Sequence, residues 1–275
     1  MTKVALLAVH GMGDTPRDFA DELIQGLRER LGPTRMADLH VESVYYQGVF
    51  QTNQERLWQD MSSQPLDMTK LRKFVLYGFS DAAALERNAE VKNSPYERVQ
   101  QVIHDALGRA QGFVGADAPV VVVAQSLGGQ VISNYLWDAQ KAGGASRGVW
   151  KDRSPTGADA EEKFRRLRTL RFLYTTGCNI PIFLGGFPKS RIKPVATSTK
   201  GYDFQWKNYY DEDDVLGWPL RPLSDAYAGA IHTDKQISAG PWPINMTPLS
   251  HTHYWEDVDV LRPLSDDLRE LGVGH

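Results

Sequence analysis

The sequence has almost no cysteine: Cys178 is the only one among 275 residues. A single cysteine excludes an internal disulfide and is typical of proteins in a reducing compartment. We also expect no secretory leader, because the opening residues MTKVALLAVHG have only a short apolar run and no small-residue cleavage site. We therefore expect a cytoplasmic protein whose first apolar run is a core strand.

Long apolar runs and an excess of positive charge are absent as well. No apolar stretch approaches the roughly 20 residues that span a bilayer, so we expect no integral membrane association. The formal net charge is −3 and the pI is near 6.2, which gives no reason to expect nucleic acid as a partner. With 41% hydrophobic residues, the chain suffices for a single domain over residues 1–275. The sequence does not indicate the oligomeric state.

What the sequence does contain is an alternation of strand-like and helix-like segments. Strands are expected at 3–9, 39–45, 120–123, 169–175 and 203–210. Helices are expected after the N-cap Thr15, after the N-cap Ser94, and over Leu127–Lys141 and Val258–Leu271. The stretch 50–90 fits helix or strand, and we favour a helical insertion. The loop-like stretch 143–158 is expected to be mobile.

This alternation predicts an α/β fold with a mostly parallel central sheet and helices on both faces, a three-layer sandwich with right-handed crossovers. In such folds ligands bind at the carboxyl ends of the strands. The residues that directly follow each strand are therefore the candidates for a functional site.

The stretch VVVVAQSLGGQVISNYL, residues 120–136, reads as a buried strand, a tight turn and a helix. Ser126 lies at the turn, with Ala124 two residues before it and Gly128 two residues after it. Small residues at these places are what a nucleophile elbow, G-x-S-x-G, requires. A plain N-cap is the alternative role for Ser126. The double glycine and the all-valine strand favour the nucleophile.

The stretch AVHGMGDTP, residues 8–16, follows the first strand. Here the backbone N–H of Met12 can serve as one oxyanion donor, and the N–H of Leu127 at the helix N-terminus as the other. Strand–Gly–x–Gly–helix also resembles the start of a dinucleotide-binding unit, but the third glycine position holds Pro16. We expect the side chain of His10 to be a structural hydrogen-bonding group.

A serine nucleophile needs a histidine base and a carboxylate that orients the base. The stretch PLSHTHYWEDVDVL offers His251, which we favour, and His253. The stretch YYDEDDV supplies the acid: Asp213 is our choice, with Asp211 and Asp214 as competitors. The chain order is then Ser126, Asp213, His251, which is the order of α/β-hydrolases.

These four stretches resemble the α/β-hydrolase fold family, in its lipase/esterase-like serine hydrolase branch. VHGMG resembles the family's oxyanion loop, AQSLGG its elbow, and YYDEDDV and SHTHYW its acid and base loops. Ala124 departs from the glycine of the usual elbow. The resemblance implies hydrolysis of a carboxylic ester through an acyl-enzyme, with no cofactor and no metal, on a small-molecule or lipid-like acyl ester.

Two other functions remain as alternatives at this point. One is a non-catalytic binding module on the same fold, because a fold does not entail an activity. The other is a nucleotide-binding oxidoreductase, which the loop after the first strand suggests. Candidates for the lining of an acyl pocket are the apolar loop 178–188 and four tryptophans, Trp206, Trp218, Trp242 and Trp255.

Overall fold

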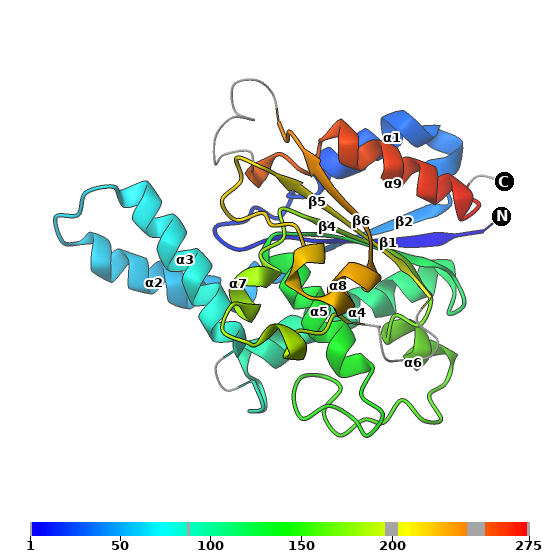
Figure 1. Ribbon diagram of the computed structural model, residues 1–275, viewed down its shortest axis with the longest axis horizontal. Coiled ribbons are helices and arrows are strands. Elements are labelled where there is room, and N and C mark those ends of the chain that lie inside the picture. The colour runs from blue at the N-terminus through cyan, green and yellow to red at the C-terminus, as the bar shows by residue number, and fades with distance from the viewer. Residues whose placement is uncertain (1, 87–88, 196–202, 241–250, 274–275) are drawn as a thin grey trace.

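The computed structural model of the chain describes residues 2–86, 89–195, 203–240 and 251–273. In these ranges it contains a six-stranded, all-parallel sheet (Figure 1). The strand order is β2-β1-β3-β4-β5-β6. The strands are β1 (Val4–Val9), β2 (Leu39–Val44), β3 (Val120–Gln125), β4 (Leu170–Thr176), β5 (Gln205–Asp211) and β6 (Ile231–Ile237).

Helices cover both faces of this sheet, as an all-parallel sheet requires. The long helices around it are α1 (Asp21–Met36), α4 (Pro95–Val114), α5 (Leu127–Ala139) and α9 (Val258–Glu270). Shorter helices are α6 (Ala160–Arg165), α7 (Ile180–Leu184) and α8 (Asp225–Ala230). Figure 1 shows α1 and α9 on one face and α4 and α5 on the other. The three-layer α/β fold predicted from the sequence is thus confirmed.

The first strand shows why both faces are apolar. Successive side chains of a strand point to opposite faces. Ala5, Leu7 and Val9 accordingly join one core cluster with α4 and α5, while Val4, Leu6 and Ala8 join the other with α1 and α9. A near-continuous apolar run is therefore the sequence pattern of a central parallel strand.

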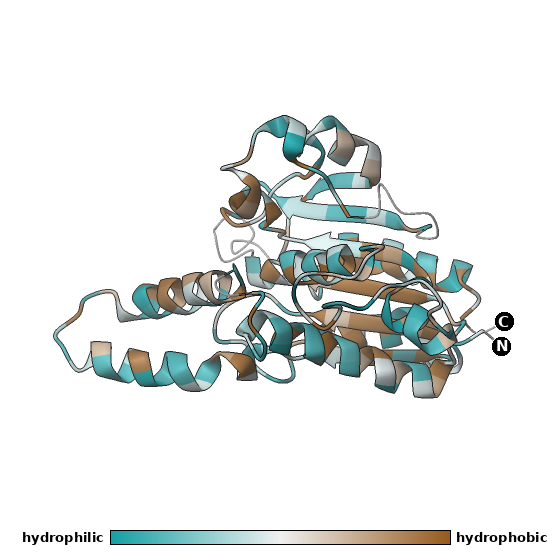
Figure 2. Ribbon diagram, turned by 90° about the horizontal axis from the view of Figure 1, so that it is seen from below, coloured by the Kyte–Doolittle hydropathy of each residue, from teal (hydrophilic) through white to brown (hydrophobic). Residues whose placement is uncertain are grey.

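Two helices stand away from the sheet. Helices α2 (Gln51–Ser62) and α3 (Thr69–Glu86) form a hairpin that projects from the body of the molecule (Figures 1 and 2). The sequence pattern favoured helix for this stretch, and the structure confirms it. No helix in the described ranges is both long enough and apolar enough to cross a membrane.

Other expectations needed correction. Thr15 does not cap the first helix, because α1 begins only at Asp21, after Ala20, and residues 17–20 form a turn. Strand β6 and helix α8 lie in a stretch for which no strand or helix was expected. The stretch 143–158, by contrast, is a loop as predicted, with no helix or strand and only an isolated bridge between Ala145 and Lys151.

The strand order places a topological switch point beside β1. The chain leaves β1 to form β2 on one side, and returns to form β3 on the other. In open α/β sheets the crevice at such a reversal, at the carboxyl ends of the strands, is the usual ligand site. The loop at Gly11 and Met12 follows β1, and Ser126 follows β3, so both lie at this crevice.

Candidate active site

Ser126 occupies the turn between β3 and α5 in a strained backbone conformation. Its φ is 54° and its ψ is −124°, a region that costs a non-glycine residue about 1–3 kcal/mol. The backbone N–H of Ser126 donates to the carbonyl oxygen of Thr176 at 2.9 Å, which ties the turn to β4. Strain held in this way by the surrounding structure is a common feature of active sites.

Small residues around the turn are a steric requirement. A Cβ on Gly11 would lie 2.7 Å from the Cβ of Ser126, and a Cβ on Gly128 would lie 2.6 Å from the carbonyl oxygens of Val9 and His10. The first turn of α5 therefore packs directly against the end of β1. This contact explains the glycine two residues after the serine.

The hydroxyl of Ser126 is not a helix cap. Ser126 is 1% exposed and makes no capping hydrogen bond. Its Oγ has no hydrogen-bond partner among the described residues. A buried hydroxyl without a partner costs about 1–3 kcal/mol, so this serine does not serve stability. The N-cap alternative is therefore wrong.

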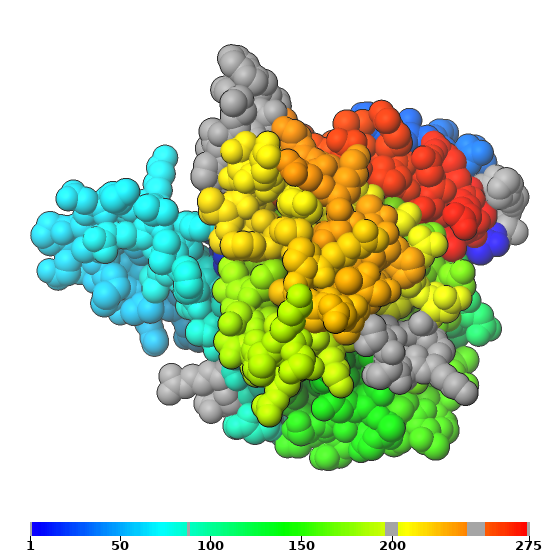
Figure 3. Space-filling model, viewed as in Figure 1, coloured from blue at the N-terminus to red at the C-terminus, as the bar shows by residue number. Residues whose placement is uncertain are grey.

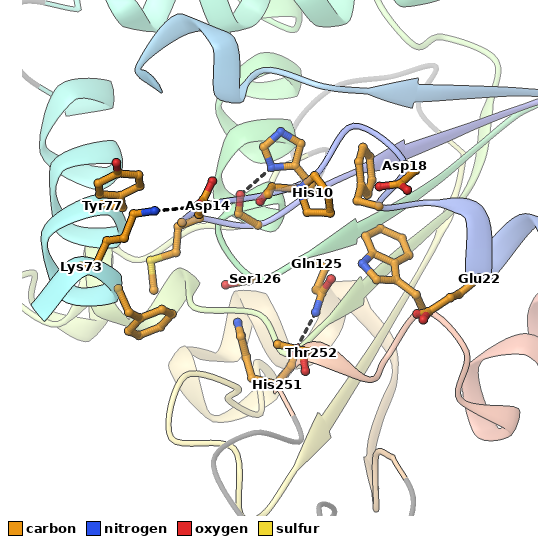
Figure 4. Close-up of a pocket in the computed structure, with 18 of the residues that line it drawn as sticks. His10, Asp14, Asp18, Glu22, Lys73, Tyr77, Gln125, Ser126, His251 and Thr252 are labelled. Atoms are coloured by element: carbon orange, nitrogen blue, oxygen red, sulfur yellow. Dashed lines mark hydrogen bonds and ion pairs between the residues drawn. The ribbon is translucent and has the colours of Figure 1, made fainter. Parts of the chain in front are cut away.

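His251 lies opposite this hydroxyl, paired with a buried carboxylate. Its Nδ1 is 2.8 Å from Oδ2 of Asp214, whose side chain is 0% exposed. A carboxylate accepts, so Nδ1 carries the proton and Nε2 keeps a free lone pair. Figure 4 shows a ring nitrogen of His251 pointing toward Ser126. The side-chain Nε2 of Gln125 also donates to the His251 carbonyl at 2.5 Å, which fixes the histidine loop beside the elbow.

Asp214 is held by two further donors. The hydroxyl of Tyr254 donates to its Oδ2 at 2.9 Å, and the backbone N–H of Leu216 donates to its Oδ1 at 2.9 Å. Burial together with the Asp214 carboxylate raises the pKa of Tyr254 far above its ordinary value, so the phenol stays a donor. The carboxylate therefore has one orientation, with an oxygen directed at His251.

The choice of Asp213 was wrong: the structure pairs Asp214, its predicted competitor, with His251. Asp213 is exposed, and its backbone N–H donates to Oδ1 of Asp211 at 2.8 Å. Asp211 is buried but accepts instead from the N–H of Ala239 at 2.6 Å. His253 pairs with the surface carboxylate of Glu256 at 2.7 Å.

Gly177 is a site residue that the sequence analysis missed. It follows β4 with a φ of +52°, and a Cβ there would lie 2.6 Å from the Tyr254 ring, 2.9 Å from Oδ2 of Asp214 and 3.2 Å from Nδ1 of His251. Only glycine leaves room for this pair to meet. The sequence signal was a glycine directly after a strand at the functional edge of the sheet.

The loop of residues 10–13 has its backbone fixed from several sides. The hydroxyl of Tyr46 donates to the carbonyls of His10 (2.8 Å) and Gly11 (3.0 Å), and the N–H of Tyr46 donates to Nε2 of His10 (3.0 Å). The backbone N–H of Gly13 donates to Oδ2 of Asp81 on α3 at 3.1 Å. These bonds hold the backbone around Met12, the first predicted oxyanion donor, in place.

His10 is a buried hydrogen-bonding group, as the sequence analysis expected. Burial lowers its pKa to about 4, so the ring is neutral at pH 7 and Nε2 accepts. Asp81 is equally buried, and burial raises its pKa to about 6. Leu127, the second predicted oxyanion donor, is the first residue of α5, where a backbone N–H has no partner within the helix.

A cleft of about 720 Å³ opens over Ser126 and His251 (Figure 4). Its walls come from the 10–16 loop, from α1 and from α3, and they include Lys70, Phe74, Tyr77 and Met12. Of the four candidate tryptophans, Trp255 lines this cleft. Trp206 is in the core and donates to Thr175, Trp218 is 44% exposed, and Trp242 lies outside the described residues.

The apolar loop 178–188 does not line the cleft. Ile180, Phe183, Leu184 and Phe187 line a separate cavity of about 390 Å³. Cys178 is a buried free thiol, and burial raises its pKa to about 12. Within the described ranges, no three histidine, cysteine or acidic side chains gather as metal ligands would.

No protein-family model matches this sequence, and no curated protein matches it. The geometry of the site is therefore the basis for its interpretation.

Proposed function

We propose that the protein is a serine hydrolase of the α/β-hydrolase type that cleaves carboxylic esters through an acyl-enzyme. The observation that carries the proposal is Ser126, whose backbone is strained and whose buried hydroxyl has no partner among the described residues while it faces the His251–Asp214 pair. A strained backbone and an orphaned hydroxyl both cost stability, and their combination beside a paired histidine is what a nucleophile requires.

In the proposed reaction, Nε2 of His251 takes the proton of Ser126 as Oγ attacks the ester carbonyl. Asp214 holds the histidine tautomer and stabilises the imidazolium. The N–H groups of Met12 and Leu127 bind the oxyanion. His251 then gives the proton to the leaving alcohol, and a water that it deprotonates releases the acid and restores Ser126.

The cleft supports a substrate with an apolar acyl part. Phe74, Met12 and Trp255 line it beside the ammonium groups of Lys70 and Lys73. Lys73 is already paired with Asp14 at 2.7 Å. A small-molecule or lipid-like acyl ester fits these walls.

The two alternatives have less support. A non-catalytic binding module would not need a strained serine aligned with a paired histidine. A nucleotide-binding oxidoreductase needs close backbone approach at a third glycine, and Pro16 stands there. Thermal shift with NAD and NADP tests the second alternative, and we expect no stabilisation.

The decisive experiment uses a fluorophosphonate probe and p-nitrophenyl esters of graded acyl length. We expect the probe to add to Ser126 with loss of fluoride, and the esters to be hydrolysed. Ser126→Ala should lose both reactions. Ser133→Ala removes another buried serine hydroxyl of α5 without a described partner, and should retain both. Labelling or turnover that persists in a folded Ser126→Ala protein would refute the proposal.

A further inference from the structure

The exposed apolar side chains of this protein are concentrated at one end. Among the described residues, seven of fourteen large exposed apolar side chains lie on the α2–α3 hairpin. Four more, Ile182, Phe187, Val215 and Trp218, follow the carboxyl ends of β4 and β5. Figure 1 places the hairpin and α7 at the same end of the molecule, the end where the strands finish.

On α3 the exposed apolar residues form a stripe. Leu71, Val75 and Phe79 are spaced four residues apart, and they are 51%, 43% and 68% exposed. Tyr77 and Asp81 face the body of the protein from another side of the same helix. Helix α2 does not cover the stripe, because its Gln54 contacts α3 at Tyr77, Ser80 and Asp81. An uncovered apolar stripe of this length marks an interaction surface.

Charge identifies the kind of partner. The segment 178–195 contains no acidic residue. It exposes Lys189, Arg191 and Lys193 next to the exposed Phe187 and Ile182. None of these three cations forms an ion pair with a described residue. Figure 3 shows the segment, in yellow-green, uncovered on the viewed face.

The cavity behind this segment points to the same partner. Phe183, Leu184 and Phe187 line its apolar walls. Arg191 and Lys193 line it as well, together with Glu86, whose carboxylate is paired with Arg147 at 3.9 Å. Apolar walls beside unpaired cations suit a molecule with a hydrocarbon part and an anionic head. Exposed apolar and basic side chains on one surface are also the pattern of peripheral attachment to anionic membranes.

We propose that this end of the protein docks on an anionic lipid surface. The docking face consists of Leu71, Val75 and Phe79 on α3, with Ile182, Phe187, Lys189, Arg191 and Lys193 on the segment after β4. The apolar side chains enter the headgroup region, and the three cations lie against the anionic headgroups. The cleft at Ser126 opens at this same end, so docking would bring it near the lipid. The binding itself does not depend on the proposed esterase activity.

The test is co-sedimentation of the full chain with vesicles. Vesicles of phosphatidylcholine containing 30% phosphatidylglycerol, a composition of roughly one anionic lipid in three, should bind it at 0.1 M salt. Pure phosphatidylcholine should bind it far less, and about 1 M salt should release it. The triple variant Lys189→Gln, Arg191→Gln, Lys193→Gln should lower the apparent affinity on the order of 100-fold, about fivefold for each cation.

Two further variants locate the surface. Phe79→Ser with Phe187→Ser should weaken binding to the same vesicles at least tenfold through lost apolar insertion. The control is Arg35→Gln, Lys163→Gln, Arg171→Gln, which removes three cations near the amino ends of the strands. It should bind like the parent protein. Circular dichroism and hydrolysis of a soluble short-chain ester, neither of which requires docking, verify the fold of each variant.

Several results would overturn the inference. One is no binding of the parent protein to the anionic vesicles. Another is equal binding to neutral vesicles, and a third is equal losses in the triple variant and its control. Sedimentation without lipid tests the other possible occupant, a second copy of the chain. If the parent protein self-associates and does not bind vesicles, and the Phe79→Ser, Phe187→Ser variant no longer self-associates, this face is an interface between two copies.

Discussion

At the scale of single residues, Ser126 shows a conflict between stability and the proposed role. It combines a positive φ with a buried hydroxyl that has no described partner. Each feature costs free energy. Residues that oppose the stability of their own fold are concentrated at functional sites.

This conflict gives the first prediction. Ser126→Ala should raise the free energy of unfolding by about 1 kcal/mol, because it removes the orphaned hydroxyl without leaving a large cavity. Ser224 is the matched control. Its Oγ donates to the Ile192 carbonyl at 2.9 Å and caps the N–H of Tyr227, so Ser224→Ala should cost about 1 kcal/mol. Urea unfolding measures both, and a destabilised Ser126→Ala protein would contradict the interpretation.

The two neighbouring aspartates give the second prediction. Asp214→Asn should lower kcat for a p-nitrophenyl ester by about 10⁴-fold, because the amide no longer enforces the tautomer of His251. Asp213→Asn changes an exposed neighbour and should leave kcat within about twofold. Steady-state kinetics on both proteins distinguishes the roles, and equal losses would count against the Asp214 pairing.

The same pair shows what the sequence leaves open at this scale. All four residues from 211 to 214 are acidic, and composition does not distinguish which of them orients the histidine. The turn after β5 decides, because it buries Asp214 and exposes Asp213. The elbow was easier to find, since Val120–Val123, Ser126 and the two following glycines lie in one continuous stretch.

At the scale of secondary-structure elements, α5 approaches β1 backbone to backbone at the site. Gly128 lies so close to the backbone oxygens of Val9 and His10 that no side chain fits. Backbone atoms cannot move aside as a flexible side chain can. The position of the helix N-terminus, and with it the Leu127 N–H, depends on this glycine.

The third prediction compares two helical glycines. Gly128→Ala should destabilise the protein by about 2–3 kcal/mol through overpacking. Gly112→Ala on α4, where a Cβ would meet nothing within 4 Å, should stabilise it by about 0.5–1 kcal/mol through helix propensity. Thermal or urea unfolding checks the opposite signs. Similar changes in the free energy of unfolding at both sites would show that the close approach of Gly128 to β1 does not affect stability.

Element prediction succeeded where local signals were strong. Ser94 caps α4 through the N–H of Glu97, as its motif predicted. The start of α1 was misplaced because Thr15 and Pro16 mimic a helix start, while the backbone there instead follows the rim of the cleft. Strand β6, with the sequence IHTDKQI, is an edge strand with exposed polar residues, so its pattern lacks the apolar run of β1 or β3.

At the scale of the whole molecule, two buried groups respond to pH in opposite directions. His10 has a pKa lowered to about 4, so the stability it confers as a neutral ring is lost as pH falls from about 6.5 to 4. Asp81 has a pKa raised to about 6, so burial of its carboxylate costs stability as pH rises from about 4 to 6. Each effect is on the order of 3 kcal/mol, and the two largely cancel.

The fourth prediction follows from this cancellation. Asp81→Asn should remove the loss of stability that the carboxyl causes as pH rises, and leave the gain that comes from His10. The free energy of unfolding should then rise more steeply between pH 4 and 6.5 than in the parent protein. Asp60→Asn, at an exposed site, controls for the loss of one carboxylate. Urea unfolding at a series of pH values measures the slopes, and parallel curves for Asp81→Asn and the parent would refute the assignment.

The fold class was predictable because hydrophobic periodicity is local, and alternating strands and helices permit few topologies. Contacts between distant segments were not. The carboxylate of Asp81 on α3 accepts a hydrogen bond from the backbone N–H of Gly13, 68 positions away in the chain. No sequence pattern predicts that bond. The hairpin was recognised as helical, but its projection from the body was not.

The strand order has a consequence for how the protein is made. From β4 to β6, each strand pairs with the strand that precedes it in the chain, and β3 pairs with β1, which is also made earlier. A chain leaving the ribosome can therefore extend its sheet outward, one edge at a time, with each new strand meeting a neighbour that already exists. His251 follows all six strands. On the proposed mechanism, the nascent protein therefore has its serine long before its base, and it becomes active only after all six strands have been made.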